Sequence, residues 1–175
     1  MGKGVFMMRK ILVSLFLVFI MVFGFASVSS AANWQWITST DDTTYSFDTT
    51  SLKDKSTKTL NPEYSQFIYS VWIKCEYTDA KGEELAAQLN FNKPIKYTLS
   101  EREFDYKNKA TKTNAMHIYA KDGTRIDSVP SYLLGSSFES IIPDSVGEVI
   151  YNTTLKEFNA QRNEQSGKTW KDYLK

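Results

Sequence analysis

The chain has 175 residues, with 21 Lys plus Arg against 20 Asp plus Glu and a formal net charge of +1. Residues 1–32 hold three of the basic residues and no acid, so residues 33–175 carry a net charge near −2. This balance provides no basic patch for nucleic acid or anionic lipid, and we expect neither as a partner. The single cysteine, Cys75, excludes an internal disulfide, so the core alone must stabilise the domain.

Residues 1–32 have the organisation of a secretory signal peptide. Basic residues precede an apolar run over 11–25, and small residues follow up to Ala32. We expect cleavage after Ala31 or Ala32, export to the periplasm, cell surface or medium, and no membrane span in the mature protein. The alternative is an uncleaved anchor, because residues 11–28 just reach the length of a span. A lipoprotein is excluded, since no cysteine stands at the cleavage point.

The remaining 143 residues are enough for one domain, expected over 33–159, followed by a polar tail over 160–175 that is frayed or weakly helical. Alternating side chains predict short strands over 34–38 and 44–47. Asp48 is suited to cap a single helical turn that runs to Lys53, and a polar loop follows as far as Pro62.

The clearest strand is predicted over 66–78. One of its faces is apolar throughout and contains Phe67, Tyr69, Val71, Ile73, Cys75 and Tyr77. A cysteine in such a row is expected to be buried and unreactive. The other face is mixed, because Ile68 and Trp72 alternate with Ser70, Lys74, Glu76 and Thr78.

The second half of the chain continues the pattern of strands and turns. A turn over 79–82 precedes a short helix over 83–89, and a second long strand over 95–106 changes phase, which predicts a bulge at 101–103. A third strand over 113–120 leads into an Asp122-Gly123 turn, expected to be of type I′, and a returning strand over 125–129. Residues 130–138 are expected to be irregular.

The C-terminal helix is predicted to begin at the Ser145/Glu148 capping box and to end near Phe158. Its apolar stripe is expected to contain Val146, Val149, Ile150 and Thr153, with Phe158 at the border. The predicted fold is therefore α+β: an antiparallel sheet of about five or six strands with a C-terminal helix packed on one face.

Few residues are suited to catalysis or metal binding. His117 is the only histidine, so a metal site lacks ligands and a Cys75–His117 dyad has no further support. Glu101 and Glu103 are spaced as a carboxylate pair, although solvated charges are the simpler interpretation. No phosphate loop, nucleophile elbow or zinc motif is present. We expect no metal or cofactor and no enzymatic activity; the alternative is a secreted hydrolase that uses Cys75 or the Glu101/Glu103 pair.

Four segments together resemble the surface-adhesin protein E-like family, namely WxWIxSTD (34–41), TYSFDTxSL (44–52), VWIKCEY (71–77) and IPDSVGE (142–148). The resemblance implies a small exported bacterial domain in which a curved antiparallel sheet carries a C-terminal helix. It also implies an adhesin-like function, with an extracellular or envelope protein as partner. Some family members tether the helix to the sheet through a disulfide, whereas Cys75 has no partner here.

Ile68 and Trp72 are the candidate partner-binding residues, because they are large apolar groups on a partly polar strand face. Such residues are either covered by the C-terminal helix or exposed as a binding patch. We expect helix cover, in which case Trp72→Ala should cost about 3–5 kcal/mol of stability.

Overall fold

The computed structural model describes residues 31–60, 65–129, 134–135 and 137–165. Residues 1–30 of the predicted signal peptide, residues 166–175 of the predicted tail and part of the irregular 130–138 segment lie outside the described residues. The chain divides into two units, Met1–Ala31 and Ala32–Lys175, and all helices and strands described below belong to the second.

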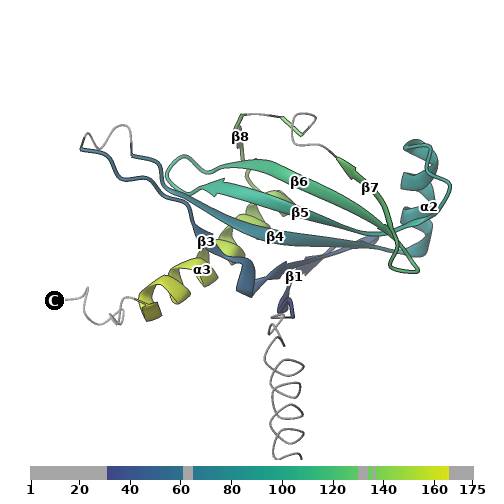
Figure 1. Cartoon of the computed structure of the whole chain (residues 1–175), viewed down its shortest axis with the longest axis horizontal. Helices are drawn as coiled ribbons and strands as arrows, with labels where there is room; N and C mark the ends of the chain where they lie inside the picture. Colours follow the sequence, from purple (N-terminus) through teal and green to yellow (C-terminus); the bar gives the residue numbers. More distant parts are fainter. Residues whose placement is uncertain (1–30, 61–64, 130–133, 136, 166–175) are drawn as a thin grey trace, which may run out of the picture. The chain divides into compact units, whose positions relative to one another are not determined.

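The second unit is built on one antiparallel sheet with the strand order β1-β2-β4-β5-β6-β7 (Figure 1). Two short strands lie off this path, since β3 pairs with β4 and β8 pairs with β6. The predicted α+β class is confirmed. The strands are β1 (Trp34–Ser39), β2 (Thr43–Asp48), β3 (Lys53–Asp54), β4 (Ile68–Tyr77), β5 (Ile95–Asp105), β6 (Ala110–Ala120), β7 (Arg125–Val129) and β8 (Glu139–Ser140).

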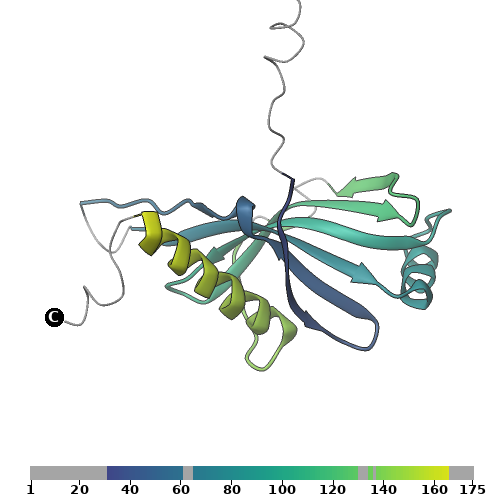
Figure 2. The same ribbon diagram turned by 90° about the horizontal axis from the view of Figure 1, so that it is seen from below.

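The apolar row of β4 forms the centre of the core, as its alternation predicts. Tyr69, Val71 and Ile73 are completely buried, and they pack with Phe47 of β2 and Phe104 of β5. The helix α3 (Val146–Gln165) lies across this side of the sheet (Figure 2). We call this side the core face.

The stripe by which α3 contacts the sheet agrees with the predicted one at Val146, Ile150 and Phe158 and differs from it at Val149 and Tyr151. Ile150, Tyr151 and Phe158 are the buried residues of the helix in the main core, whereas Val149 is 42% exposed. The helix also continues beyond Phe158 to Gln165. The prediction placed the stripe about one residue too early because Thr154, a polar residue, is fully buried and was not counted as part of the core.

Thr154 is accommodated in the core by hydrogen bonds. Its Oγ1 lies 2.9 Å from the hydroxyl of Tyr69 and 2.9 Å from the Ile150 carbonyl, to which it donates. The Tyr69 ring also stacks on Phe158, with centroids 4.8 Å apart, and on Phe104 at 5.2 Å. Tyr69 therefore joins the helix to the sheet through both its ring and its hydroxyl.

Two predicted caps are present. Asp48 accepts a hydrogen bond from the Thr50 amide at 3.0 Å and starts a 3₁₀ turn, η1 (Thr49–Ser51), which is followed by β3 rather than by a continuing loop. At the start of α3 the Ser145 hydroxyl accepts from the Glu148 amide at 3.2 Å. The Glu148 carboxylate accepts in turn from the Asp144 amide at 2.9 Å, one residue before the position expected in a capping box.

Three turn and bulge predictions can be compared with the strand registers. The bulge in β5 is confirmed by a register shift between Glu101 and Arg102, and a second shift lies between Ile95 and Tyr97. The Asp122-Gly123 hairpin is present and Gly123 has a φ of 79°, but the predicted type I′ turn is wrong, because that type needs a positive φ at both central residues and Asp122 does not have one. The Gly123 amide donates to the Ala120 carbonyl at 3.0 Å, so the turn is centred on Lys121 and Asp122. The prediction of a separate turn over 79–82 is wrong, because these residues form the start of α2 (Asp79–Gln88), with Thr78 as the N-cap.

Gly82 is the residue at which α2 approaches the sheet. A Cβ at this position would overlap the carbonyl oxygen of Ile95, the first residue of β5. Gly82→Ala is therefore expected to lower the free energy of unfolding by about 1–3 kcal/mol, as overpacking does. Helix propensity alone predicts the opposite sign, a gain of about 0.5–1 kcal/mol.

Chemical denaturation followed by circular dichroism measures this difference. Ala87→Gly, at an exposed position of the same helix, is the control for propensity alone and should cost about 1 kcal/mol. A Gly82→Ala variant more stable than the parent protein would contradict the close approach of α2 to β5.

Candidate functional site

The face of the sheet opposite α2 and α3 carries a group of aromatic side chains. Directly opposed residues of antiparallel strands lie on the same face, so the registers identify which residues share it. One row across the sheet joins Trp36, Ser46, Lys74, Leu99, His117 and Ser128. We define the aromatic face by six of the residues on this side, namely Trp34, Trp36, Trp72, Tyr97, His117 and Tyr119.

Trp72 belongs to the aromatic face, and the prediction that the C-terminal helix covers it is wrong. The α3 side chains pack on Tyr69, Val71 and Ile73, which alternate with Trp72 along β4 and lie on the core face. Trp72 is half-buried and its ring stacks on His117 at 5.7 Å with an interplanar angle of 16°. Ile68, the other candidate, is only 8% exposed and presents little surface to a partner.

The His117 ring, which stacks on Trp72, is also held by a hydrogen bond from the neighbouring strand. Its Nδ1 lies 2.9 Å from the Ser128 hydroxyl, on the neighbouring strand β7. A second aromatic pair lies one row further along, where Tyr97 and Tyr119 stack at 4.7 Å. The ammonium group of Lys74 lies 5.1 Å from the centroid of the Tyr97 ring, within the range of a cation–π interaction.

The two tryptophans of β1 are the most exposed members of the group. Trp36 is 62% exposed and Trp34 is 37% exposed. The indole Nε1 of Trp36 donates to the Ser39 hydroxyl at 3.1 Å, which orients the ring. In the sequence these tryptophans indicate only a strand and a family motif, although their alternate spacing is the signal that they share a face.

The Glu101/Glu103 pair also lies on this side of the sheet, but both carboxylates are engaged by lysines. Lys55 is 2.9 Å from Glu103 and 3.4 Å from Glu101, and Lys112 is 2.9 Å from the second oxygen of Glu103. Burial raises the pKa of Glu103, but the hydrogen bonds from Lys55 and Lys112 lower it more, and the resulting pKa is about 2. Glu103 is therefore a carboxylate at neutral pH and does not hold the proton that a general acid donates.

This pKa predicts how stability depends on pH. The carboxyl group titrates near 4.5 in its ordinary state and near 2 in the folded protein, so its ion pairs stabilise the fold fully above pH 4.5. Glu103→Gln is expected to lower the unfolding free energy above that pH, and the loss should disappear as the pH falls toward 2. Glu101→Gln, which removes a single longer contact, is the matched control. A loss that does not vary between pH 2 and 7 would contradict the ion-pair assignment.

Cys75 and His117 do not form a dyad, because Cys75 lies on the core face and His117 on the aromatic face. The thiol is free and buried, and burial raises its pKa more than the nearby charge of Arg102 lowers it. We expect the native protein to react slowly with a thiol reagent near neutral pH and rapidly after unfolding. Fast labelling of the folded protein would contradict the burial of Cys75 and support the alternative in which it is a nucleophile.

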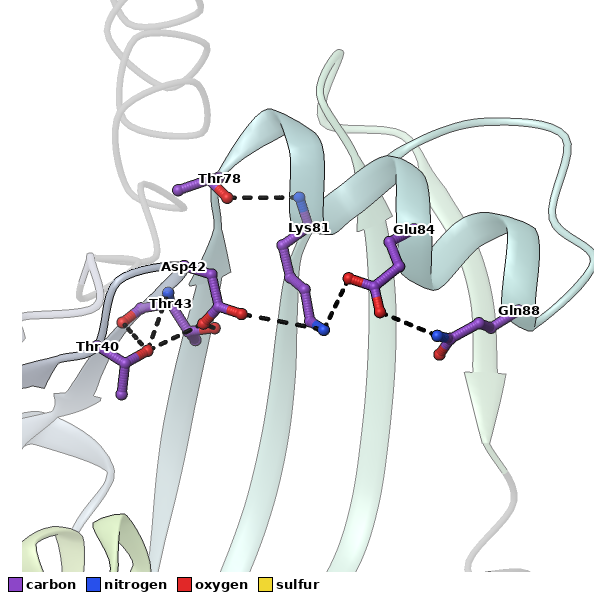
Figure 3. Close-up of polar contacts among 7 residues, drawn as sticks. All are labelled: Thr40, Asp42, Thr43, Thr78, Lys81, Glu84 and Gln88. Atoms are coloured by element: carbon purple, nitrogen blue, oxygen red, sulfur yellow. Dashed lines mark hydrogen bonds and ion pairs between the residues drawn. The ribbon is translucent and has the colours of Figure 1, made fainter.

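A pocket of about 420 Å³ lies where β4 ends and the β1–β2 turn meets α2. Its neighbourhood is polar: Asp42 accepts from Thr40 and Thr43, and Lys81 lies 3.9 Å from Asp42 and 2.9 Å from Glu84 (Figure 3). These side chains form hydrogen bonds and ion pairs with one another and so link the β1–β2 turn to α2. Their role is therefore to stabilise the fold. The pocket is lined by Thr40, Asp41, Asp42, Thr43, Thr44, Glu76, Tyr77, Thr78 and Lys96.

The described part of the chain contains no group of three or more His, Cys, Asp or Glu side chains arranged to hold a metal ion. Its helices are not long and apolar enough to cross a membrane.

The fold and this face define the class of the protein as an α+β domain with an aromatic sheet face that neither α2 nor α3 covers. Comparisons with protein-family models, with curated proteins and with solved structures find no match to the chain.

Proposed function

We propose that the protein is an exported, non-enzymatic binding domain of the bacterial surface or envelope, and that the aromatic face is its binding surface. The observation that carries the proposal is the concentration of Trp34, Trp36 and Trp72 on the side of the sheet that α2 and α3 leave open. Large aromatic side chains are usually withdrawn into a core, and a group of them at the surface is typical of an interaction site.

Two further features support this proposal. The signal-peptide organisation of residues 1–32 supports export, which would bring the domain to host or envelope macromolecules. The resemblance to the surface-adhesin protein E-like family indicates the same kind of role. The hydrolase alternative is less well supported, since Cys75 is buried and Glu103 is ionised and paired with lysines.

The test is solid-phase binding of the exported protein to host matrix proteins and to envelope fractions. We expect saturable binding that Trp36→Ala and Trp72→Ala each weaken at least tenfold. Ile142→Ala is the control, because Ile142 is an apolar residue of comparable exposure to Trp36 and precedes α3 rather than lying on the aromatic face. Absence of saturable binding, or equal binding by all three variants, would overturn the proposal.

A further inference from the structure

We infer that the ligand of the aromatic face is a glycan, a chain of uncharged sugars that lies across the strands. The inference rests on the proposed function and specifies the class of partner. It follows from three properties of the face: the charges that border the aromatic residues, the kind of apolar side chains present, and the way in which the rings are held.

The charges bordering the aromatic residues neutralise one another. Lys74 is 2.9 Å from Glu76, and the Lys55–Glu103–Lys112 group, with Glu101, has been described above. Together these are three lysines and three glutamates. Arg125, opposite Tyr119 on β7, and Asp48, opposite Trp34 on β2, add one charge of each sign, so the balance is unchanged. A charged ligand placed here would compete with existing ion pairs and would find no surplus of opposite charge, whereas an uncharged ligand would disturb none of them.

The apolar surface of this face is aromatic rather than aliphatic. Leu99 is half-buried and Ile68 is buried, so neither offers much aliphatic surface. The centres of protein–protein interfaces are enriched in Met and Arg as well as in aromatic residues. Here Met116 and Arg102 lie on the core face, opposite Ser100 and Val71, whereas Arg125 lies on the aromatic side at the β7 edge, opposite Tyr119. The apolar part of the face is therefore built from aromatic rings, which favours a partner that stacks on them.

A sugar ring suits such a surface because it has both an apolar and a polar side. The C–H groups of a sugar carry slight positive charge and are attracted to the electron-rich face of an indole or phenol ring. The hydroxyl groups at the sugar's edge need hydrogen-bond partners nearby. Ser46 and Ser128, which lie in the same row as Trp36 and His117, and the carboxylate of Glu101 are such partners.

Two of the rings are oriented before any ligand arrives. Ser39 fixes the indole of Trp36, and its hydroxyl lies 3.2 Å from that of Thr44. His117, bonded to Ser128, supports the indole of Trp72 by stacking. Side chains that are already ordered lose less entropy on binding, which raises affinity without additional contacts.

The separation of these two rings indicates a chain rather than a single sugar. Trp36 is on β1 and Trp72 is on β4, with β2 between them. Strands lie about 4.8 Å apart, so the two positions are about 10 Å apart across the sheet. A ligand that contacts both tryptophans must therefore span more than one sugar ring.

The experiment uses the exported protein and neutral hexasaccharides of β-1,4-glucose, β-1,4-N-acetylglucosamine and α-mannose as probes. Binding is measured by calorimetry and by tryptophan fluorescence. We expect at least one hexasaccharide to bind and to change the fluorescence, with an affinity that varies less than about twofold between about 50 and 500 mM salt. The corresponding monosaccharide should bind at least tenfold more weakly.

Variants then locate the site. Trp36→Ala and Trp72→Ala should each weaken glycan binding at least tenfold, Trp72→Phe should retain most of it because an aromatic ring is kept, and Ile142→Ala should have no effect. Thermal unfolding of each variant identifies any that fail to fold. Absence of binding to all three hexasaccharides, or binding unchanged in both alanine variants, overturns the inference.

The outcomes also separate this inference from the proposed function. Binding to matrix or envelope proteins that depends on Trp36 and Trp72, without any glycan binding, would overturn the glycan assignment and leave the binding function intact. A sulfated glycan that binds more tightly, with steep loss of affinity at high salt, would overturn the assignment to an uncharged chain. Failure of both protein and glycan binding would overturn both proposals.

Discussion

Phe158→Ala is expected to lower the free energy of unfolding by about 3–5 kcal/mol, the usual cost of removing a large buried aromatic side chain. Phe158 is 4% exposed and its ring lies nearly parallel to that of Tyr69, at an interplanar angle of 14°. The substitution leaves a cavity between α3 and the sheet and removes the stacking contact. Urea denaturation followed by far-ultraviolet circular dichroism measures the loss.

Val149→Ala is the matched control for this prediction. Val149 is on the same helix but 42% exposed, so its truncation should change stability by less than about 0.5 kcal/mol. The helical stripe predicted from sequence would instead make Val149 a core residue. A loss for Val149→Ala as large as that for Phe158→Ala would show that α3 is rotated relative to the arrangement described above.

The second large effect on stability is expected at Tyr69, where two substitutions separate the contribution of the ring from that of the hydroxyl. Tyr69→Ala should cost about 3–5 kcal/mol, because the completely buried ring contacts both Phe104 and Phe158. Tyr69→Phe keeps the ring and removes the hydroxyl, which lies 2.9 Å from the Thr154 hydroxyl and donates to the Tyr151 carbonyl at 3.3 Å, so it should cost about 1 kcal/mol. Thermal and chemical unfolding of the two variants give the two contributions.

Tyr119→Phe serves as the control for loss of a hydroxyl. Tyr119 is half-buried on the aromatic face, and within the described residues its hydroxyl makes no hydrogen bond. Its removal should leave stability unchanged within about 0.5 kcal/mol. If Tyr69→Phe also left the free energy of unfolding unchanged, the hydrogen bonds of the Tyr69 hydroxyl would not contribute to holding the helix on the sheet.

Local patterns in the sequence determined much of the strand structure. The alternation over 66–78 identified which residues of β4 share a face, because side chains of a strand point alternately to opposite sides. The phase change over 95–106 located the bulge in β5, and Asp122-Gly123 located the hairpin turn. Ser145 and Glu148 located the start of α3. Each of these features depends on residues that are close together in the chain.

Only the tertiary structure decided which face the helices cover. Both faces of β4 carry large apolar residues, Tyr69 and Val71 on one and Ile68 and Trp72 on the other, so the alternation by itself did not distinguish them. The strand registers align Tyr69 with Phe104 and Ile73 with Phe47, which makes one face continuously apolar across three strands. Helix α3 packs where the largest apolar area is buried.

Which side of α3 faces the sheet, and why Trp72 is left uncovered by that helix, both follow from the packing of α3 on the core face. The buried Thr154 belongs to the helical stripe because the Tyr69 hydroxyl, which is distant in the sequence, satisfies it at 2.9 Å. Trp72 is left on the other side of the sheet, where it meets His117 of β6, two strands away. Such contacts between distant segments carry no local signature, because periodicity reports which residues share a face and not what lies against that face.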